Sequence, residues 1–398
     1  MRIGIFGSGQ LAWMLGREVK RRGDSLRIIG GVEGDPAFSI ADEFIPQSKL
    51  LTEEGRRESI NNCDSLFFES EFLDFSLWHS LLSRAENVFP RAQVMRLLSD
   101  KWEQKKLFEK YNLPTAKAQL LEGEVPFGKW VAKWSRQGYD GYGNFFLTRT
   151  HGVDEWKLFL RKAQEKGALV YLEEEIPFEA ECSLIVARDS KGSFLNYPLL
   201  ISEQKKGICE WVYGPAKDFL PEASQECEKL LVKIKTLLDD LSYVGVAAFE
   251  LFWSQGKLYL NEVAPRVHNT GHITLDAFSI NQFELHLKSA RGFDSIAIEA
   301  LSQKIMMKNL LGTESFDRLS CELKAEVFFE KKGSVNLRNR SALYWYGKKE
   351  LRKGRKLGHI NQIFSEDLSL ANMKSILTLQ EEKAWARIRE YVQAESVH

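Results

Sequence analysis

The sequence predicts a protein of mixed class, in which a parallel α/β unit precedes α+β units. Strand and helix patterns alternate over roughly the first 97 residues, as is typical of a parallel sheet with crossover helices. A helical segment then leads into strands with a glycine-rich connection, and the C-terminal part returns to short strands. We therefore expect domains at 1–97, 98–295 and 296–398, with a lid subdomain at about 115–175.

Composition excludes several classes of function. The 398 residues are 44% hydrophobic, which is enough for a large core. Lys plus Arg equals Asp plus Glu at 55 each, so no net field favours nucleic acid or an anionic membrane. We find no transmembrane or signal pattern, and the five scattered cysteines form no C-x-x-C pair. We expect a soluble, cytoplasmic protein without a nucleic-acid or membrane partner.

The first unit places acidic residues at a strand end. Its expected elements are strands at Arg2–Phe6, Ser25–Ile29 and Ser65–Phe68 and an amphipathic helix that ends near Arg22. Glu69 and Glu71 directly follow the third of these strands. In open parallel sheets, ligands bind beyond the carboxyl ends of the strands. The sequence therefore predicts a binding site at this edge.

The turn Gly7–Ala12 is open to two interpretations. It follows a strand, begins a helix and fits the looser dinucleotide pattern Gly-x-Gly-x-x-Ala, with Glu33 or Asp35 as the ribose-binding acid. That interpretation predicts a nicotinamide or flavin enzyme. However, any phosphate can bind at a helix N-terminus behind a tight glycine turn, and a dinucleotide site has no need of Gln10.

A lysine and a glycine-rich loop lie together in the second unit. Lys133 lies near the end of an apolar strand, and the loop Gln137–Asn144 follows. Such a lysine can reach a nucleotide phosphate while the backbone amides of the loop close over the others. The alternative is an exposed lysine beside a flexible hairpin.

An acidic segment follows further along the chain. Glu173, Glu174 and Ile176 suit a hinge strand whose main chain meets an adenine, and Glu181 lies where it can meet a ribose hydroxyl. Acidic runs are more often solvated faces, which is the alternative interpretation.

Two glutamates lie in a predicted hairpin. Strands at Val246–Trp253 and Lys257–Val263 flank a short turn, and symmetrical pairing about Gly256 sets Glu250 opposite Glu262. Two carboxylates at that distance repel unless a cation lies between them. Magnesium with oxygen ligands and substrate phosphates is the expected cation, whereas a solvated hairpin face is the alternative. Arg266, His268, Asn269 and His272 follow and favour a functional site.

The remaining elements complete the pattern. They are strands at Leu169–Glu173, Cys182–Ala187, Lys324–Phe329 and Ala342–Tyr346 and helices at Lys101–Tyr111, Ala223–Leu241 and Ala384–Gln393. The basic segment Lys348–Lys356 is predicted to bind a phosphate group, with Arg355 offering bidentate contacts. A solvated basic turn is the alternative for Lys349, Arg352 and Lys353.

Taken in order, these motifs resemble the ATP-grasp superfamily. The most specific segments are Gly9–Leu11, Gly138–Gly141, Asn261–His272, Tyr346–Lys348 and Gly354–His359. Within the superfamily the chain resembles the 5-(carboxyamino)imidazole ribonucleotide synthases over nearly its whole length. The ending His-Asn-x-Gly-His separates it from the related transformylases, which tend to have His-Asp-x-Gly-Met.

The resemblance implies a fold and a reaction. The fold is an ATP-grasp domain with a lid subdomain, behind an N-terminal parallel α/β (pre-ATP-grasp) domain and before a small β-rich C-terminal domain that completes the substrate site. The reaction converts ATP and bicarbonate to carboxyphosphate, which carboxylates 5-aminoimidazole ribonucleotide in purine biosynthesis. Magnesium is the implied metal, and a homodimer and a functional link to the mutase that consumes the product are also implied.

The resemblance also assigns residues to roles. Glu250 and Glu262 would hold magnesium, and Arg266, His268 and Asn269 would act near bicarbonate and carboxyphosphate. The positions implied for ATP are Lys101, Lys133, Gly138, Gly141, Glu173, Glu174, Ile176, Glu181 and Asn261. Those implied for 5-aminoimidazole ribonucleotide are Gly9, Gln10, Leu11, Glu69, Tyr139, Asp140, Lys348 and Arg355.

Four departures from the family pattern affect these expectations. Trp13, Phe72, Tyr142 and Asn144 stand where the family usually has arginine, asparagine, lysine and glutamine. The departures leave open a divergent ATP-grasp ligase or transformylase with another amine acceptor, or a non-catalytic ATP-binding protein. The magnesium acids and Lys133 are kept, so ATP use is the more direct expectation.

Overall fold

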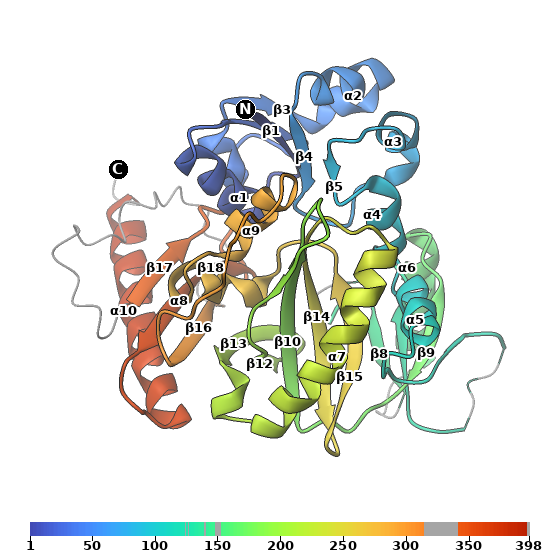
Figure 1. Cartoon of the computed structure of the whole chain (residues 1–398), viewed down its shortest axis with the longest axis vertical. Helices are drawn as coiled ribbons and strands as arrows, with labels where there is room; N and C mark the ends of the chain where they lie inside the picture. Colours follow the sequence, from blue (N-terminus) through green and yellow to red (C-terminus); the bar gives the residue numbers. More distant parts are fainter. Residues whose placement is uncertain (124, 126, 139–140, 148–152, 314–340, 396–398) are drawn as a thin grey trace.

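Three sheets organise the computed structural model, which describes all residues except 124, 126, 139–140, 148–152, 314–340, 396–398 and the side chains of 391–395. The N-terminal sheet is parallel, in the order β3-β2-β1-β4-β5. A nine-stranded antiparallel sheet forms the centre, and a four-stranded sheet, β6-β9-β7-β8, lies at its side (Figure 1). The expected mixture of α/β and α+β units is confirmed, whereas the exact domain limits stay predictions.

The N-terminal sheet is buried on both faces, as its apolar strands require. Its elements are β1 (Arg2–Phe6), α1 (Gln10–Arg21), β2 (Ser25–Ile29), η1 (Pro36–Ile40), β3 (Glu43–Ile45), η2 (Gln47–Leu51), α2 (Glu53–Ile60), β4 (Ser65–Phe68), α3 (Phe75–Leu82), β5 (Val88–Phe89) and α4 (Ala92–Leu98). Phe6 stacks on Phe68 with ring centroids 5.1 Å apart, and Trp78 of α3 packs edge-on against Phe6 at 4.9 Å. The expected strands β1, β2 and β4 are confirmed.

The four-stranded sheet and one helix form a small unit beside the central sheet (Figure 1). After α5 (Lys101–Lys110), its elements are β6 (Ala118–Leu120), β7 (Trp130–Trp134), β8 (Asn144–Phe146), α6 (Val153–Glu165) and β9 (Val170–Glu174). Trp134 and Phe159 of α6 pack in its core with ring centroids 5.4 Å apart.

The central sheet carries Glu181 and the acidic hairpin. Its elements are β10 (Ala180–Arg188), β11 (Phe194–Asn196), β12 (Leu200–Lys205), β13 (Ile208–Gly214), η3 (Ala216–Asp218), α7 (Pro221–Asp240), β14 (Gly245–Ser254), β15 (Lys257–Ala264), η4 (Asn269–Ile273), α8 (Thr274–Ala277) and α9 (Gln282–Ser289). Helix α7 covers one face (Figure 1), and its residues Cys227, Ile234 and Leu238 are buried in the core there. Helices α8 and α9 occupy the other face together with the N-terminal unit.

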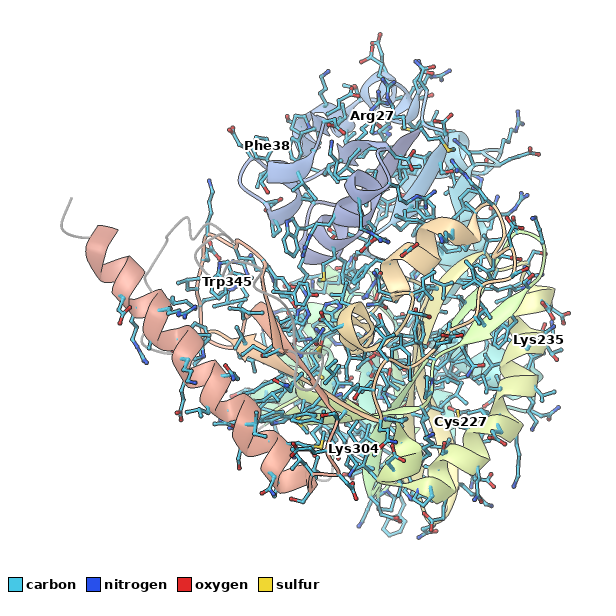
Figure 2. The ribbon with its side chains drawn as sticks, turned by 60° about the vertical axis from the view of Figure 1, so that its left-hand side comes forward. Arg27, Phe38, Cys227, Lys235, Lys304 and Trp345 are labelled. Carbon is cyan, nitrogen blue, oxygen red and sulfur yellow. The ribbon has the colours of Figure 1, made fainter. Side chains whose placement is uncertain are left out.

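The C-terminal strands extend the central sheet. They are β16 (Lys304–Leu311), β17 (Ser341–Trp345) and β18 (Lys356–Phe364), and β16 pairs with β13. Trp345 packs against Trp385 of the last helix, α10 (Leu370–Glu395), with ring centroids 6.3 Å apart (Figure 2). Helix α10 begins well before the expected residue 384. The expected strand Lys324–Phe329 lies outside the described residues.

None of the described helices combines the length and the apolarity needed to cross a bilayer.

Candidate active site

Two adjoining cavities lie where the central sheet meets the small four-stranded unit. Their volumes are about 710 and 630 Å³. Residues of the N-terminal unit and of the segment 348–356 also line the smaller cavity. The residues that line both cavities are Lys101, Tyr142, Glu250, Glu262, His268, Asn269 and Lys356. Because these residues are shared, the two cavities form the halves of one site, with the acidic hairpin at their junction.

A β-bulge sets the geometry of the hairpin. Ser254 pairs with Lys257, so regular pairing would set Glu250 opposite Asn261. The register shifts by one residue before that point, and Glu250 pairs with Glu262 instead. A bulge turns two successive residues of one strand toward the same side. Asn261 and Glu262 consequently both line the larger cavity.

The two hairpin carboxylates have different partners. Glu262 forms an ion pair with Lys101, the first residue of α5, whose start is fixed by Asp100 accepting from the Trp102 and Glu103 amides. His268 Nε2 lies 3.2 Å from Glu250 Oε1. Burial acts to raise the pKa of Glu250, but the hydrogen bond from His268 and the charge of Lys101 outweigh it and lower the pKa to about 2.

Lys133 is held by a buried network beside the hairpin. Its ammonium lies 2.5 Å from Glu173 Oε2 and donates to Asn261 Oδ1 at 2.8 Å. Lys105 lies 2.9 Å from the other oxygen of Glu173. Burial acts to raise the pKa of Glu173, but the two lysines lower it to about 2. The Glu173 side chain therefore positions Lys133, and a contact with adenosine stays a prediction for that residue.

The larger cavity has an apolar end that suits a planar ring. Glu174 and Ile176 line it, and Phe178 stacks on Phe252 with centroids 4.6 Å apart and an interplanar angle of 9°. Glu181 also lines this cavity, and its Oε2 is buried without a hydrogen-bond partner among the described residues. Burial, and then the nearby charge of Glu250, raise the pKa of Glu181 to about 7.

The glycine-rich loop borders both cavities. Gly141 lines the larger cavity and Gly138 the smaller one. Tyr142 packs edge-on against Trp134 at 5.0 Å, and Asn144 begins β8. Tyr139 and Asp140 lie outside the described residues.

The smaller cavity continues into a third, of about 430 Å³, which is lined mainly by residues of the N-terminal unit and by residues 348 and 355 of the C-terminal part. Gly9, Gln10, Leu11, Glu69, Arg266, Lys348 and Arg355 all line this third cavity. Lys348 donates to Gln10 Oε1 and to the Lys356 carbonyl, both at 2.7 Å. The cationic side chains of Lys348, Arg355 and Arg266 together make this end suitable for an anionic group.

Glu69 occupies the place that a dinucleotide phosphate would need. Its carboxylate accepts from the amides of Gly9 at 2.7 Å and Ala12 at 2.9 Å. A Cβ on Gly7, whose φ is +102°, would lie 2.3 Å from Glu69 Oε1. Asp35, one candidate for the ribose acid, instead accepts from Ser8 Oγ at 2.6 Å. The glycine turn is therefore satisfied within the protein, which disfavours the dinucleotide interpretation.

Arg266 and Asn269 are held by distant partners. Arg266 forms both arms of a forked contact with Glu71 of the N-terminal unit, and its Nη2 donates at 3.0 Å. Burial acts to lower the pKa of Arg266, but Glu71 outweighs it and raises the pKa. Asn269 and Asn309 of β16 exchange amide hydrogen bonds at 3.0 and 2.8 Å.

The departures from the family pattern do not all lie at the site. Trp13 is only 8% exposed, packs near Tyr346, and lies outside the described cavities. Phe72 and Tyr142 do line the smaller cavity. His272 is fully buried in the core and lines none of the described cavities.

The oxygen ligands of the hairpin fit magnesium in part. Among the described residues, no group of three His, Cys, Asp or Glu side chains is placed to hold a metal. Glu250 and Glu262 are a facing pair of carboxylates, and Asn261 adds an amide oxygen. Magnesium commonly takes one or two carboxylates and completes its shell with water and substrate phosphates. The donor set therefore fits a magnesium ion that arrives with a nucleotide.

Sequence reasoning missed several residues of the site. Lys105 lies one helical turn after Lys101, so the same face of α5 delivers two lysines. Phe252 lies two residues after Glu250 on the same face of β14. These two positions were open to periodicity arguments. The pairing of Glu71 with Arg266 was not, because 195 residues separate them.

Comparison with known proteins agrees with this geometry. Residues 109–283 match the ATP-grasp domain family, and residues 306–372 match the phosphoribosylaminoimidazole carboxylase C-terminal domain family. The first match spans the small four-stranded unit, the acidic hairpin and η4. The second spans most of β16 and continues through β18.

Similar proteins cover nearly the whole chain. The N5-carboxyaminoimidazole ribonucleotide synthase of Synechococcus elongatus is 33% identical over 96% of this chain and 95% of its own length. The Staphylococcus aureus N5-carboxyaminoimidazole synthetase, solved with ADP, has a TM-score of 0.77 at 22% identity and covers 96% of each chain. The Aspergillus clavatus synthase, solved with ADP and 5-aminoimidazole ribonucleotide, has a TM-score of 0.72 at 23% identity and covers 94% of this chain and 96% of its own. Because the Synechococcus elongatus relative is 33% identical over nearly the whole chain and both domain matches agree, the chain belongs to the N5-carboxyaminoimidazole ribonucleotide synthase family of ATP-grasp ligases.

Proposed function

We propose that this chain carboxylates the exocyclic amine of 5-aminoimidazole ribonucleotide with ATP and bicarbonate. The observation that carries the proposal is the pair of joined cavities with the acidic hairpin at their junction. One half offers a stacking surface and two lysines to a nucleotide, and the other ends in Lys348 and Arg355. The Aspergillus clavatus relative, which was solved with ADP and 5-aminoimidazole ribonucleotide, supports a site that takes these two ligands.

The first step is phosphoryl transfer to bicarbonate. Lys101 and Lys133 bind the ATP phosphates, and Glu173 and Asn261 hold Lys133 in place. A bicarbonate oxygen attacks the γ-phosphorus, and ADP leaves with the bridging oxygen, which gives carboxyphosphate. A magnesium ion bound by Glu250 and Glu262 would neutralise charge on the transferred phosphoryl group.

The second step is carboxylation of the amine. Lys348 and Arg355 bind the ribonucleotide phosphate, His268 lies at the junction where carboxyphosphate forms, and Arg266 lines the smaller cavity beside it. The amine attacks the carboxyl carbon, inorganic phosphate leaves, and the amine loses one proton as the carbamate forms. The loop with Gly138 and Gly141 limits the access of water to carboxyphosphate.

The oligomeric state, the localisation and a functional partner are also part of this proposal. The resemblance supports a cytoplasmic homodimer with a functional link to the mutase that consumes its product. Sedimentation of the purified chain measures the oligomeric state, and a monomer at micromolar concentration would contradict the homodimer.

The test is ADP release with magnesium and bicarbonate, with and without 5-aminoimidazole ribonucleotide. We expect strong stimulation by the ribonucleotide, and we expect Glu262→Gln to lower the stimulated rate by roughly 100-fold or more. Glu222→Gln, at an exposed position of α7, is the matched control and keeps the wild-type rate. ATP binding without stimulation would instead support another acceptor or a non-catalytic protein.

A further inference from the structure

A closed ring of side chains surrounds the His268 imidazole. Ser183 of β10 is the direct cross-strand partner of Glu250 of β14, so the two side chains lie side by side on one face of the sheet. Ser183 Oγ lies 2.6 Å from Thr270 Oγ1, and Thr270 Oγ1 lies 2.9 Å from His268 Nδ1. The other ring nitrogen faces Glu250 at 3.2 Å, which closes the ring.

The direction of these hydrogen bonds follows from one backbone group. The Thr270 amide donates to His268 Nδ1 at 3.4 Å. An amide N–H only donates, so Nδ1 accepts and carries no proton. In the neutral imidazole the proton is then on Nε2, and it points to the carboxylate of Glu250. The hydroxyls follow the same order, with Ser183 donating to Thr270 and Thr270 donating to Nδ1.

Both hydroxyl groups are shielded from solvent. Ser183 is 1% exposed and Thr270 is 3% exposed. Ser183 lines none of the described cavities and therefore lies behind the reacting groups. A buried hydroxyl chain that ends on one nitrogen of a site histidine holds both the ring angle and the tautomer of that histidine.

We propose that Thr270 and Ser183 are positioning residues that fix His268 as the Nε2–H tautomer facing Glu250 and the junction of the two cavities. The single N–H of His268 is thereby directed to the Glu250 carboxylate and holds that carboxylate in place at the junction, where phosphoryl transfer occurs in the proposed function. The kinetic consequences rest on that function, whereas the tautomer is a property of the protein alone.

The first test is the protonation pattern of the ring. Selective ¹⁵N labelling of the histidines and two-bond ¹H–¹⁵N correlation distinguish the two neutral tautomers, and loss of one signal set in His268→Asn assigns the residue among the seven histidines. We expect the Nε2–H form in the wild type and a mixture of tautomers in Thr270→Val. A dominant Nδ1–H form in the wild type would overturn the proposal, whatever reaction the enzyme catalyses.

The second test separates positioning from folding. Thr270→Val keeps the shape of the side chain but removes the hydroxyl, and Thr270→Ser restores the hydroxyl. We expect Thr270→Val to lower kcat by roughly 10- to 100-fold with an unchanged KM for ATP, and Thr270→Ser to stay within about 3-fold of wild type. Equal losses in both variants would show a packing effect and overturn the proposal.

The third test uses the coupling between the two hydroxyls. Ser183→Ala should lower kcat less than Thr270→Val, and the double variant should be no worse than Thr270→Val alone, because both act through one nitrogen. Ser289→Ala is the matched control, since Ser289 is fully buried and donates only to the His286 carbonyl at 2.6 Å. Additive losses, or an equal kcat loss in the control, would contradict the shared path.

Discussion

Arg266, just after β15, forms an ion pair with the carboxylate of Glu71, which lies beyond the end of β4 in the N-terminal unit. The two side chains are 14% and 17% exposed, so the pair is largely shielded from water. This contact joins the edge of the parallel sheet to the end of the acidic hairpin. Separating the two units here would leave each partner as a largely buried charge without a counterion. The ion pair therefore stabilises the contact between the two units.

Glu71→Gln should therefore damage both stability and activity. The neutral amide keeps the shape but leaves Arg266 without a counterion, and breaking such a pair costs about 3 kcal/mol of unfolding free energy. We also expect kcat to fall by roughly 10-fold, because Arg266 lines the smaller cavity, beside the junction where we propose that carboxyphosphate forms. Urea unfolding and the stimulated ADP release measure these effects. Wild-type stability with a wild-type rate would show that Arg266 finds another partner.

Glu173 should make stability depend on pH in the acid range. Its pKa is lowered from an ordinary 4.5 to about 2, so its stabilising effect is fully present above pH 4.5 and is lost as the pH falls toward 2. The shift corresponds to about 3 kcal/mol. We expect Glu173→Gln to be less stable than wild type at pH 7, and the gap to narrow as the pH falls from 5 toward 3. A gap that stays constant over this range would contradict the pairing with Lys105 and Lys133.

Glu181 should have the opposite dependence. Its pKa is raised from 4.5 to about 7, so its stabilising effect is present below pH 4.5 and is lost as the pH rises through 7. In the absence of nucleotide, Glu181→Gln should gain stability relative to wild type by roughly 2 kcal/mol between pH 5 and pH 8. Thermal unfolding at the two pH values measures the difference. A variant that loses stability relative to wild type as the pH rises would refute the assignment.

Substitution of Trp13 should change the stability of the protein and leave its binding of 5-aminoimidazole ribonucleotide unchanged. An arginine in its place would enter a buried site whose indole ring already lies 5.0 Å from the Arg17 guanidinium. We expect Trp13→Arg to lower the unfolding free energy by about 3 kcal/mol, with an unchanged KM for 5-aminoimidazole ribonucleotide. Trp13→Phe keeps an aromatic ring and should cost less. A lower KM in Trp13→Arg without loss of stability would place residue 13 at the substrate.

Local patterns predicted much of the fold. The strands β1, β2 and β4 and the helix α7 follow from short apolar runs and from helical periodicity, which depend on neighbouring residues alone. Helix α10 was expected to be much shorter, although Leu370, Met373 and Leu377 recur at helical spacing in its first part and pack in the core beside the sheet. This part of the helix was therefore open to a periodicity argument and was missed.

The site was predictable where it depends on local patterns and unpredictable where it depends on contacts between distant segments. The pairing of Glu250 with Glu262 came from the symmetry of a hairpin, and the register confirms it. The bulge that produces this pairing depends on one residue of slippage and was not predicted. The glycine turn stayed ambiguous, because Glu69, the group that fills it, arrives from another strand. Contacts between distant segments, such as Lys348 with Gln10, likewise require the assembled fold.

The extra residue in β15 has a consequence for how this site tolerates insertions and deletions. A hairpin one residue shorter, lacking Asn261, would pair regularly and would still set the two glutamates face to face. The carboxylate pair would therefore survive the loss of this residue, whereas the amide that holds Lys133 would be lost with it. A chain that lost this single residue would keep its acidic pair and lose the link between that pair and its phosphate-binding lysine.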